Sequence, residues 1–276
     1  IGIRAPTTPL RAIFMLLWRR LMIRVRGRRL KPAPKGGISN LFVQRMDMLW
    51  GIGAALSPMD QLRGTVYQAE HMLLAMRSGD PYRYARALAI ESTTYATANN
   101  DPGQLQRVID AATEAGGACG HPHGLSAAKG TASLCRMLEG RFRDSVRMAR
   151  EAQQIIRERL HGTLAWDHAI MVLYELRTVA LLGHVNEIME RVPEFLRDAE
   201  ARGDNFAAVS GRTSHCCWAW LGKDQPELAL EQVQLAERRW SADGYYLQHW
   251  YTTQAFGEVA LYRDEPDEAW RRLARE

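Results

Sequence analysis

The chain has 276 residues, of which 46% are hydrophobic, so it is long enough for one large domain or two ordinary ones with buried cores. Its formal net charge is +5, but eleven Lys and Arg residues precede the first acidic residue, Asp47, and the rest carries 25 Lys and Arg against 31 Asp and Glu. The positive charge therefore belongs to the N-terminal segment, and it does not indicate that the main body binds nucleic acid.

The ends and the cysteines place the chain in a broad class. It begins at Ile1 and stops inside a helical pattern, so we expect a segment of a longer protein. The cysteines are few and show no CxxC spacing, which favours reduced thiols in a cytoplasmic protein. They are Cys119, Cys135, Cys216 and Cys217.

Residues 8–27 predict a basic amphipathic helix, followed by a Pro/Gly linker over 28–37, and together residues 1–38 form the first predicted region. Its longest uncharged run, 12–18, is far shorter than the roughly 20 residues that span a bilayer. Two interpretations stay open. The helix packs against an upstream domain, or residues 8–29 lie weakly on an anionic membrane surface. Its apolar stripe consists of Leu10, Phe14, Leu17, Leu21 and Val25.

Residues 39–276 predict only helices, because no run has the alternation or β-branched enrichment of a strand. Helices taken alternately begin about 40 residues apart, in two independent series, which indicates an array of roughly six antiparallel helix pairs with the last one truncated. The predicted helices span 40–56, 60–78, 82–98, 102–116, 122–138, 141–158, 164–182, 184–202, 206–221, 225–242, 245–262 and 265–276.

The turns between these helices carry a recurring pattern. Asp224, Pro226 and Glu227 predict a capped helix start, with Asp224 as the cap and Glu227 closing a capping box. Asp264 and Pro266 repeat it. Asp80 and Asp101 likewise precede prolines and are expected to cap. The inter-helix glycines are expected to take the left-handed conformation that ends a helix; they are Gly140, Gly183 and Gly222.

The most metal-like group is Cys119, His121 and His123, because thiolates and imidazoles are good zinc ligands. It supplies three groups within five residues and no fourth ligand, and Pro122 is more simply explained as a helix start. We therefore expect no metal, no cofactor and no catalytic residue in this segment. The alternative is a stand-alone helical metalloenzyme or metal-binding protein that uses these three side chains.

Aromatic residues gather in the last third of the chain. In an array of helix pairs, the first helix of each pair lines one face, and aromatic anchors on such a face often carry binding energy. Packing between neighbouring repeats is the competing explanation. The predicted binding residues are Trp218, Tyr246, Trp250 and Tyr251.

The turn residues over 140–145 and 222–229 look like those of tetratricopeptide (TPR) repeats, although the period is longer. Several phrases extend the likeness over most of the chain, at 41–50, 62–64, 73–91 and 247–251. They resemble the C-terminal helical-repeat region of large bacterial serine/threonine protein kinases, which carry a kinase domain, an ATPase module and then such repeats. The resemblance implies a TPR-like α-solenoid that mediates protein–protein or ligand binding in signal transduction, with a protein partner or the upstream kinase and ATPase domains as its target. None of that family's ATP-binding or kinase motifs lies in this segment.

Overall fold

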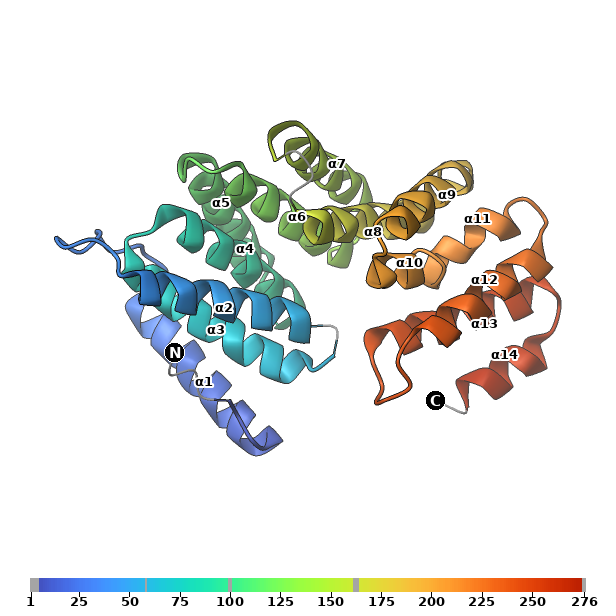
Figure 1. The fold of residues 1–276 in the computed structure, drawn as a ribbon, viewed down its shortest axis with the longest axis horizontal. Helices are drawn as coiled ribbons and strands as arrows, with labels where there is room; N and C mark the ends of the chain where they lie inside the picture. The colour runs from blue at the N-terminus through green and yellow to red at the C-terminus, as the bar shows by residue number, and fades with distance from the viewer. Residues whose placement is uncertain (1–4, 58, 99–100, 161–163, 275–276) are drawn as a thin grey trace. The chain divides into compact units, whose positions relative to one another are not determined.

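The computed structural model describes residues 5–57, 59–98, 101–160 and 164–274. Every regular element in those ranges is a helix, so the all-α class is confirmed (Figure 1). The elements are α1 Pro9–Arg26, α2 Asn40–Leu56, α3 Gln61–Ser78, α4 Pro81–Ala98, α5 Pro102–Ala118, α6 Pro122–Leu138, α7 Phe142–Arg159, α8 Ala165–Leu181, α9 Val185–Ala201, α10 Asn205–Ser210, the 3₁₀ helix η1 Ser214–Cys217, α11 Trp218–Leu221, α12 Pro226–Arg239, α13 Leu247–Tyr262 and α14 Pro266–Leu273.

The chain divides into two compact units. Unit 1 comprises Ile1–Glu139 with Gln154–His161, and unit 2 comprises Gly140–Gln153 with Gly162–Glu276. Each unit has its own apolar core, built from helices that are too amphipathic to hide their apolar faces alone.

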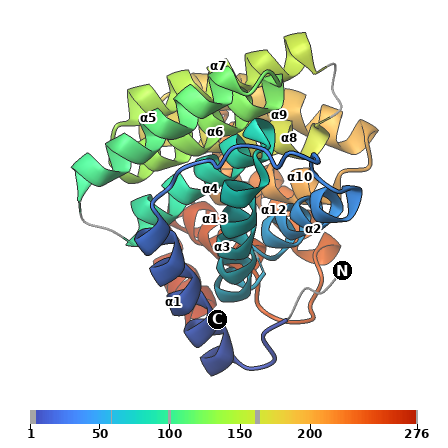
Figure 2. The ribbon, with the colours of Figure 1, turned by 90° about the vertical axis from the view of Figure 1, so that its left-hand side faces the viewer.

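In unit 1, neighbouring helices pack as antiparallel partners, α2 with α3 and α4 with α5, and α6 continues against both α4 and α5. Helix α1 packs along α3, on the outside of this unit (Figure 2). Met46, Leu49, Met72 and Leu88 are almost completely buried where these helices meet.

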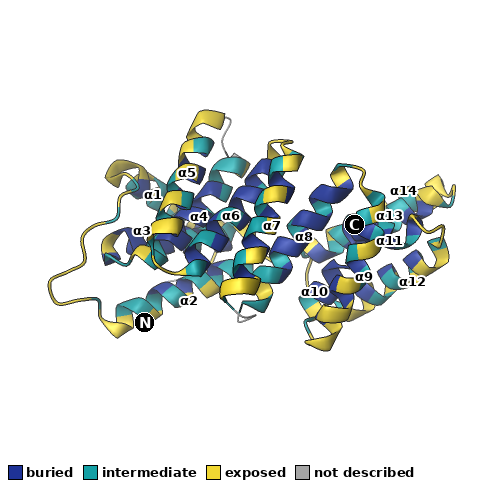
Figure 3. Ribbon diagram, turned by 90° about the horizontal axis from the view of Figure 1, so that it is seen from above, coloured by how far each residue is buried: buried dark blue, intermediate teal, exposed yellow. Residues whose placement is uncertain are grey.

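In unit 2, helix α8 pairs with α9, the segment from α10 to α11 pairs with α12, and α13 pairs with α14. The first members of these pairs also touch, because η1 contacts both α8 and α13. Leu176, Ile188 and Val233 are buried at the contacts, and the exposed residues lie on the outward faces (Figure 3). The face shared by α8, η1 and α13 positions the site described below.

In the turns between helices, a residue in the left-handed backbone conformation is followed by the N-cap residue of the next helix. Gly140 and Gly183 adopt φ of +75° and +74°, as predicted. The predicted caps at Asp80 and Asp101 are also confirmed, because the Asp80 carboxylate accepts from the backbone N–H of Arg83 at 3.0 Å and Asp101 caps α5. These residues act locally, so the sequence predicts them well.

The predicted helix caps in the turns before α12 and α14 are wrong. Asp224 and Asp264 do not cap these helices; they are themselves the left-handed residues, with φ of +56° and +60°. The N-caps are Gln225 and Glu265, which make no side-chain capping bond. Aspartate tolerates the left-handed region better than most residues, so it substitutes here for glycine.

Gly222 is a further correction. Its φ of −64° is helical, not left-handed. A Cβ atom at Gly222 would lie 2.6 Å from Val185 Cγ1 and 2.9 Å from Met189 Sδ. The position therefore excludes a side chain because α9 approaches closely, and the left-handed role passes to Asp224 two residues later.

The helix predicted over 206–221 is interrupted in the structure. Helix α10 ends at Ser210, and η1 and α11 follow after a short break. Gly211 packs on the side chains of Phe195 and Leu196, which a Cβ there would approach to 2.8–3.0 Å. Ser214, the first residue of η1, has φ of +51°, which the interior of a right-handed helix does not accommodate, so the chain turns here before the helix resumes.

The apolar stripe of α1 is exposed. Leu10, Phe14, Leu17, Leu21 and Val25 are between 50% and 80% accessible, whereas Ala12 and Ile23 on the opposite side are buried. Helix α1 therefore packs through its narrower face. None of the described helices is long and apolar enough to cross a bilayer.

Candidate functional site

Two of the four predicted aromatic residues take part in contacts along one side of α13. Tyr251 lies on the face that α8, η1 and α13 share in unit 2, and Trp218 of α11 bonds to Glu258 of α13; both aromatic side chains are half-buried. Trp250 and Tyr246 do not join them. Trp250 is 47% exposed on a neighbouring side of α13, and Tyr246 stacks on His249 at the helix N-terminus.

Helix α13 presents three polar side chains to this face. Tyr251, Gln254 and Glu258 recur at spacings of three and four residues, which places them along one side of the helix. Each of them bonds to a residue of α8, η1 or α11. These hydrogen bonds therefore join segments that are about 40 to 75 residues apart in the sequence.

Arg177 of α8 supplies the positive charge of the face. Its guanidinium carbon lies 4.1 Å from the centroid of the Tyr251 ring, and its Nη1 donates to the Tyr251 hydroxyl at 2.8 Å. Stacking on an aromatic ring holds the guanidinium flat and in place. Among the described residues Arg177 has no carboxylate partner, and its side chain is only half-buried.

Glu258 supplies the negative charge. Its carboxylate accepts from the indole Nε1 of Trp218 at 2.6 Å and from the amide of Gln254 at 2.8 Å. Its only basic neighbour in the described part of the chain is His215, at 3.8 Å. Burial lowers the pKa of His215, and the charge of Arg177 acts in the same direction, against Glu258, so His215 is neutral at pH 7.

A neutral His215 closes the hydrogen-bond network. Its Nε2 accepts from Gln254 at 3.2 Å, so its Nδ1 carries the proton and faces the Ser214 hydroxyl at 3.3 Å. That hydroxyl donates to Gln254 Oε1 at 3.2 Å. The network satisfies its own members, and this fixes the orientation of the Trp218 and Gln254 side chains.

The thiols beside this face are not poised for nucleophilic chemistry. Cys216 and Cys217 are both buried. Burial raises the pKa of Cys216 to about 12, and burial together with Glu258 raises the pKa of Cys217 well above its ordinary value. A thiol is a nucleophile only as the thiolate, so neither Cys216 nor Cys217 is activated as a nucleophile.

The three metal-like residues are engaged with their own surroundings. Cys119 Sγ donates to the backbone carbonyl of Gly116 at 3.2 Å, and His121 Nδ1 accepts from the backbone N–H of His123 at 3.2 Å, which caps α6. His123 Nδ1 lies 2.7 Å from the Tyr82 hydroxyl. No group of three His, Cys, Asp or Glu residues in the described part of the chain has the arrangement of a metal site.

Sequence reasoning missed a second polar cluster, which links Asp47 of α2 to Arg83 and Arg86 of α4 in unit 1. Asp47 accepts from Arg83 Nε at 3.0 Å and from Arg86 Nη2 at 2.9 Å. The Arg86 guanidinium lies 4.6 Å from the ring of Trp50 and 4.7 Å from that of Tyr82. Only the spacing of Arg83 and Arg86 on one helix face hinted at it, since their partner is on another helix.

This cluster is closed and holds the helices of unit 1 together. Burial raises the pKa of Asp47, but hydrogen bonds and the charges of Arg83 and Arg86 outweigh it and hold the pKa below its ordinary value. Arg86 is 6% exposed, whereas the Asp47 side chain is 41% exposed but already paired with both arginines.

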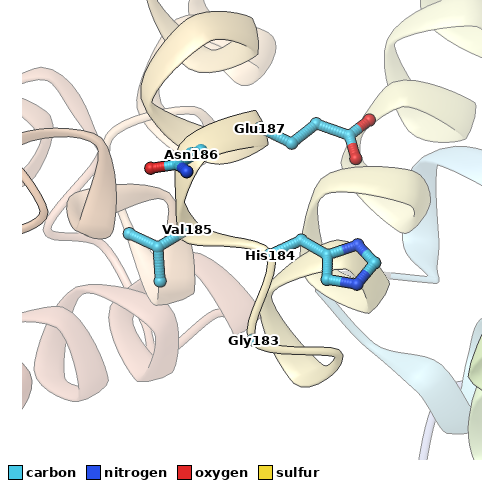
Figure 4. Close-up of a pocket in the computed structure, with 5 residues that line it drawn as sticks. All are labelled: Gly183, His184, Val185, Asn186 and Glu187. Carbon is cyan, nitrogen blue, oxygen red and sulfur yellow. The ribbon is translucent and has the colours of Figure 1, made fainter.

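An open hollow is lined by the turn Gly183–Glu187 between α8 and α9. His184 and Glu187 point to one side of the turn and Val185 to the other (Figure 4). The Glu187 carboxylate is paired with Arg150 and lies 3.8 Å from Arg191. The hollow is shallow and its charged group already has partners, so it is a weaker candidate than the face around Arg177 and Tyr251.

The comparisons with known proteins add no family. No family model, no curated protein and no solved structure matches the chain. The choice of the unit 2 face as the candidate site therefore rests on its geometry alone.

Proposed function

We propose that the chain is a non-catalytic helical-repeat scaffold that binds a protein partner, with a TPR-like arrangement of helix pairs. The helix bounds support the repeat. The first helices of successive pairs begin at residues 40, 81, 122, 165, 205 and 247, and the second helices at 61, 102, 142, 185, 226 and 266. A constant step in both series is typical of arrays in which each pair covers the apolar face of its neighbour.

The observation that carries the binding function is the Arg177–Tyr251 pair. A guanidinium that is half-buried against an aromatic ring and without a carboxylate partner among the described residues retains N–H donors beyond the one bonded to the Tyr251 hydroxyl. Such a group binds a carboxylate with little loss of side-chain entropy. We infer that the partner presents an acidic side chain or chain terminus to Arg177 and apolar surface to the exposed Trp250.

The cellular setting is a proposal that rests on the resemblance to bacterial kinases. In that setting the chain is the cytoplasmic, regulatory part of a multidomain serine/threonine kinase with an ATPase module. Partner binding on unit 2 then biases the upstream enzyme. The coding sequence upstream tests this, because a kinase catalytic loop and an ATP-binding loop are expected there, and their absence contradicts the setting but not the binding function.

Peptide selection on the purified chain tests the binding function. We expect a displayed random-peptide library to yield peptides rich in Asp and Glu. Synthetic copies of these peptides should lose about tenfold or more in affinity on Arg177→Gln or Tyr251→Ala, since a charge-assisted hydrogen bond contributes about 1.5–3 kcal/mol. Fluorescence polarisation measures the dissociation constants.

Trp270→Ala is the matched control, because Trp270 is 70% exposed on α14 and lies outside the network around Arg177. It should leave the affinity unchanged. A library that yields no peptide, or peptides that bind Arg177→Gln as tightly as the original chain, contradicts the proposed function.

A further inference from the structure

Helix α1 has two apolar faces, and only one of them is used inside the chain. Ala12 and Ile23 are buried against unit 1. Two ion pairs hold this side in place, Arg19 with Glu70 and Arg20 Nη1 with Glu91 Oε2 at 2.6 Å. The helix is therefore anchored to α3 and α4 independently of whatever its other face contacts.

The opposite face is a continuous exposed apolar surface, which we name the α1 stripe. Its members recur at spacings of three and four residues along the whole helix, so they lie in one row. They are Leu10, Phe14, Leu17, Leu21 and Val25, with Trp18 beside them, all at least 50% exposed. Rows of large exposed apolar side chains on a folded protein mark contact surfaces, because leaving them in water is unfavourable.

Positive charge borders the α1 stripe on both sides. At 100° per residue, Arg11 falls on one edge of the row and Arg24 on the other. Both are exposed, and neither has an ion-pair partner among the described residues. Arg26, Arg29 and Lys31 continue the exposed positive charge beyond the helix. No acidic residue occurs before Asp47.

This charge pattern indicates what kind of surface the α1 stripe contacts. In a symmetric dimer the same surface meets itself, so the arginine edges of two stripes would face each other without an acidic residue on α1 to offset them. An anionic surface with an apolar layer beneath it matches both features. Apolar residues enter the boundary between headgroups and acyl chains, and the bordering arginines remain at the level of the phosphates.

We propose that α1 docks the protein on the surface of a bilayer that contains anionic lipid, with the α1 stripe facing the acyl chains. The helix has 18 residues, which corresponds to about 27 Å lying in the membrane plane. Each arginine near such a surface adds electrostatic attraction that salt screens, so the interaction weakens as salt rises. This surface is separate from the face around Arg177 and Tyr251, which belongs to unit 2.

Vesicle co-sedimentation of the full chain tests the proposal. The probes are phosphatidylcholine vesicles with or without about 30% phosphatidylglycerol, in about 0.15 M NaCl, where charges are screened over about 8 Å. We expect binding to the anionic vesicles only. The double variant Phe14→Ser/Leu17→Ser should lose at least about tenfold in partitioning, because it removes two apolar side chains from the buried side. Arg11→Gln/Arg24→Gln should lose about tenfold or more.

Two matched controls keep the test specific. Leu41→Ser changes a residue that is 61% exposed on α2, and Arg157→Gln/Arg159→Gln removes two exposed arginines of α7. Both should bind like the original chain. All altered side chains are exposed, so thermal unfolding followed by circular dichroism should be unchanged and excludes misfolding as the cause.

Four results overturn the proposal. The original chain stays in the supernatant with anionic vesicles, or it binds both kinds of vesicle equally, or the variants of the α1 stripe bind like the controls. A dimer in solution that Phe14→Ser/Leu17→Ser dissociates also overturns it, since the stripe then covers a second copy of the chain.

Discussion

His71 is a buried histidine that makes unit 1 sensitive to acid. It is 2% exposed, packs edge-on against Trp50 with ring centroids 5.7 Å apart, and leaves Nε2 without a hydrogen-bond partner among the described residues. Burial, followed by the positive charge of Arg86, lowers its pKa to about 3. The folded protein therefore excludes a proton that the unfolded chain accepts below pH 6.5.

Because the pKa of His71 is lowered on folding, the protein loses stability as the pH falls. Stability contributed by neutral His71 is complete above pH 6.5 and is lost as the pH falls from there toward 3, by about 1.4 kcal/mol per pH unit. Between pH 7 and pH 5 this amounts to about 2 kcal/mol. We expect His71→Leu to reduce the loss of unfolding free energy over that interval by about this amount, measured by urea unfolding at both values.

The control for this prediction is His184→Gln, which removes an exposed histidine of unit 2 and tests whether the effect is specific to the buried His71. Asp47, whose pKa is lowered, loses its contribution only below its unfolded pKa of 3.8, outside the interval. If His71→Leu shows the same difference between pH 7 and pH 5 as the original chain, His71 is already protonated in the folded state and its assigned environment is wrong.

At the scale of the elements, substitution by alanine should have opposite effects on stability at two glycines of unit 2, one in an inter-helix turn and one inside a helix. Gly140 adopts φ of +75°, and no atom lies within 4 Å of the position that a Cβ would take there, so Gly140→Ala adds backbone strain alone and should destabilise by about 1 kcal/mol. Gly257 is inside α13 and equally unobstructed, so Gly257→Ala should stabilise by about 0.5–1 kcal/mol. Chemical unfolding measures both, and the same sign at both positions contradicts the turn geometry.

The helices themselves could be predicted from the sequence because their signals are local. Apolar periodicity, the caps at Asp80 and Asp101, and the left-handed glycines at 140 and 183 each depend on a few neighbouring residues. Gly222 could not be assigned in this way, because its small size serves a contact with α9 that lies about 35 residues away. The break at Gly211 has the same origin in Phe195 and Leu196.

The candidate site could be predicted only in part for the same reason. Trp218 and Tyr251 stood out as aromatic residues on first helices, and the structure places both on the face of unit 2. Arg177, which gives that face its charge, is 74 residues from Tyr251 and carries no motif. For α1 the periodicity identified the stripe, but its exposure depends on which of two apolar faces α3 covers.

At the scale of the whole molecule, positive charge and exposed apolar side chains are concentrated in different parts of the chain from the face around Arg177. The excess of positive charge lies before Asp47 and borders the exposed α1 stripe, whereas the sequence from Asp47 onward is net acidic. Within that acidic part, Arg177 is a positive group without a carboxylate partner among the described residues. We therefore propose that the chain binds a lipid surface through α1 and an acidic partner through unit 2, and that a substitution can abolish either interaction without the other.

Photo-cross-linking tests the binding face most directly. A benzophenone amino acid in place of Leu247, which is 42% exposed one turn before Tyr251 on α13, should cross-link to a selected acidic peptide. The same group in place of Leu228, which is 36% exposed on α12, should not. We predict a cross-link from position 247 that Arg177→Gln abolishes. Cross-linking from position 228 alone, or equally from both positions, would show that the partner does not bind the face formed by α8, η1 and α13.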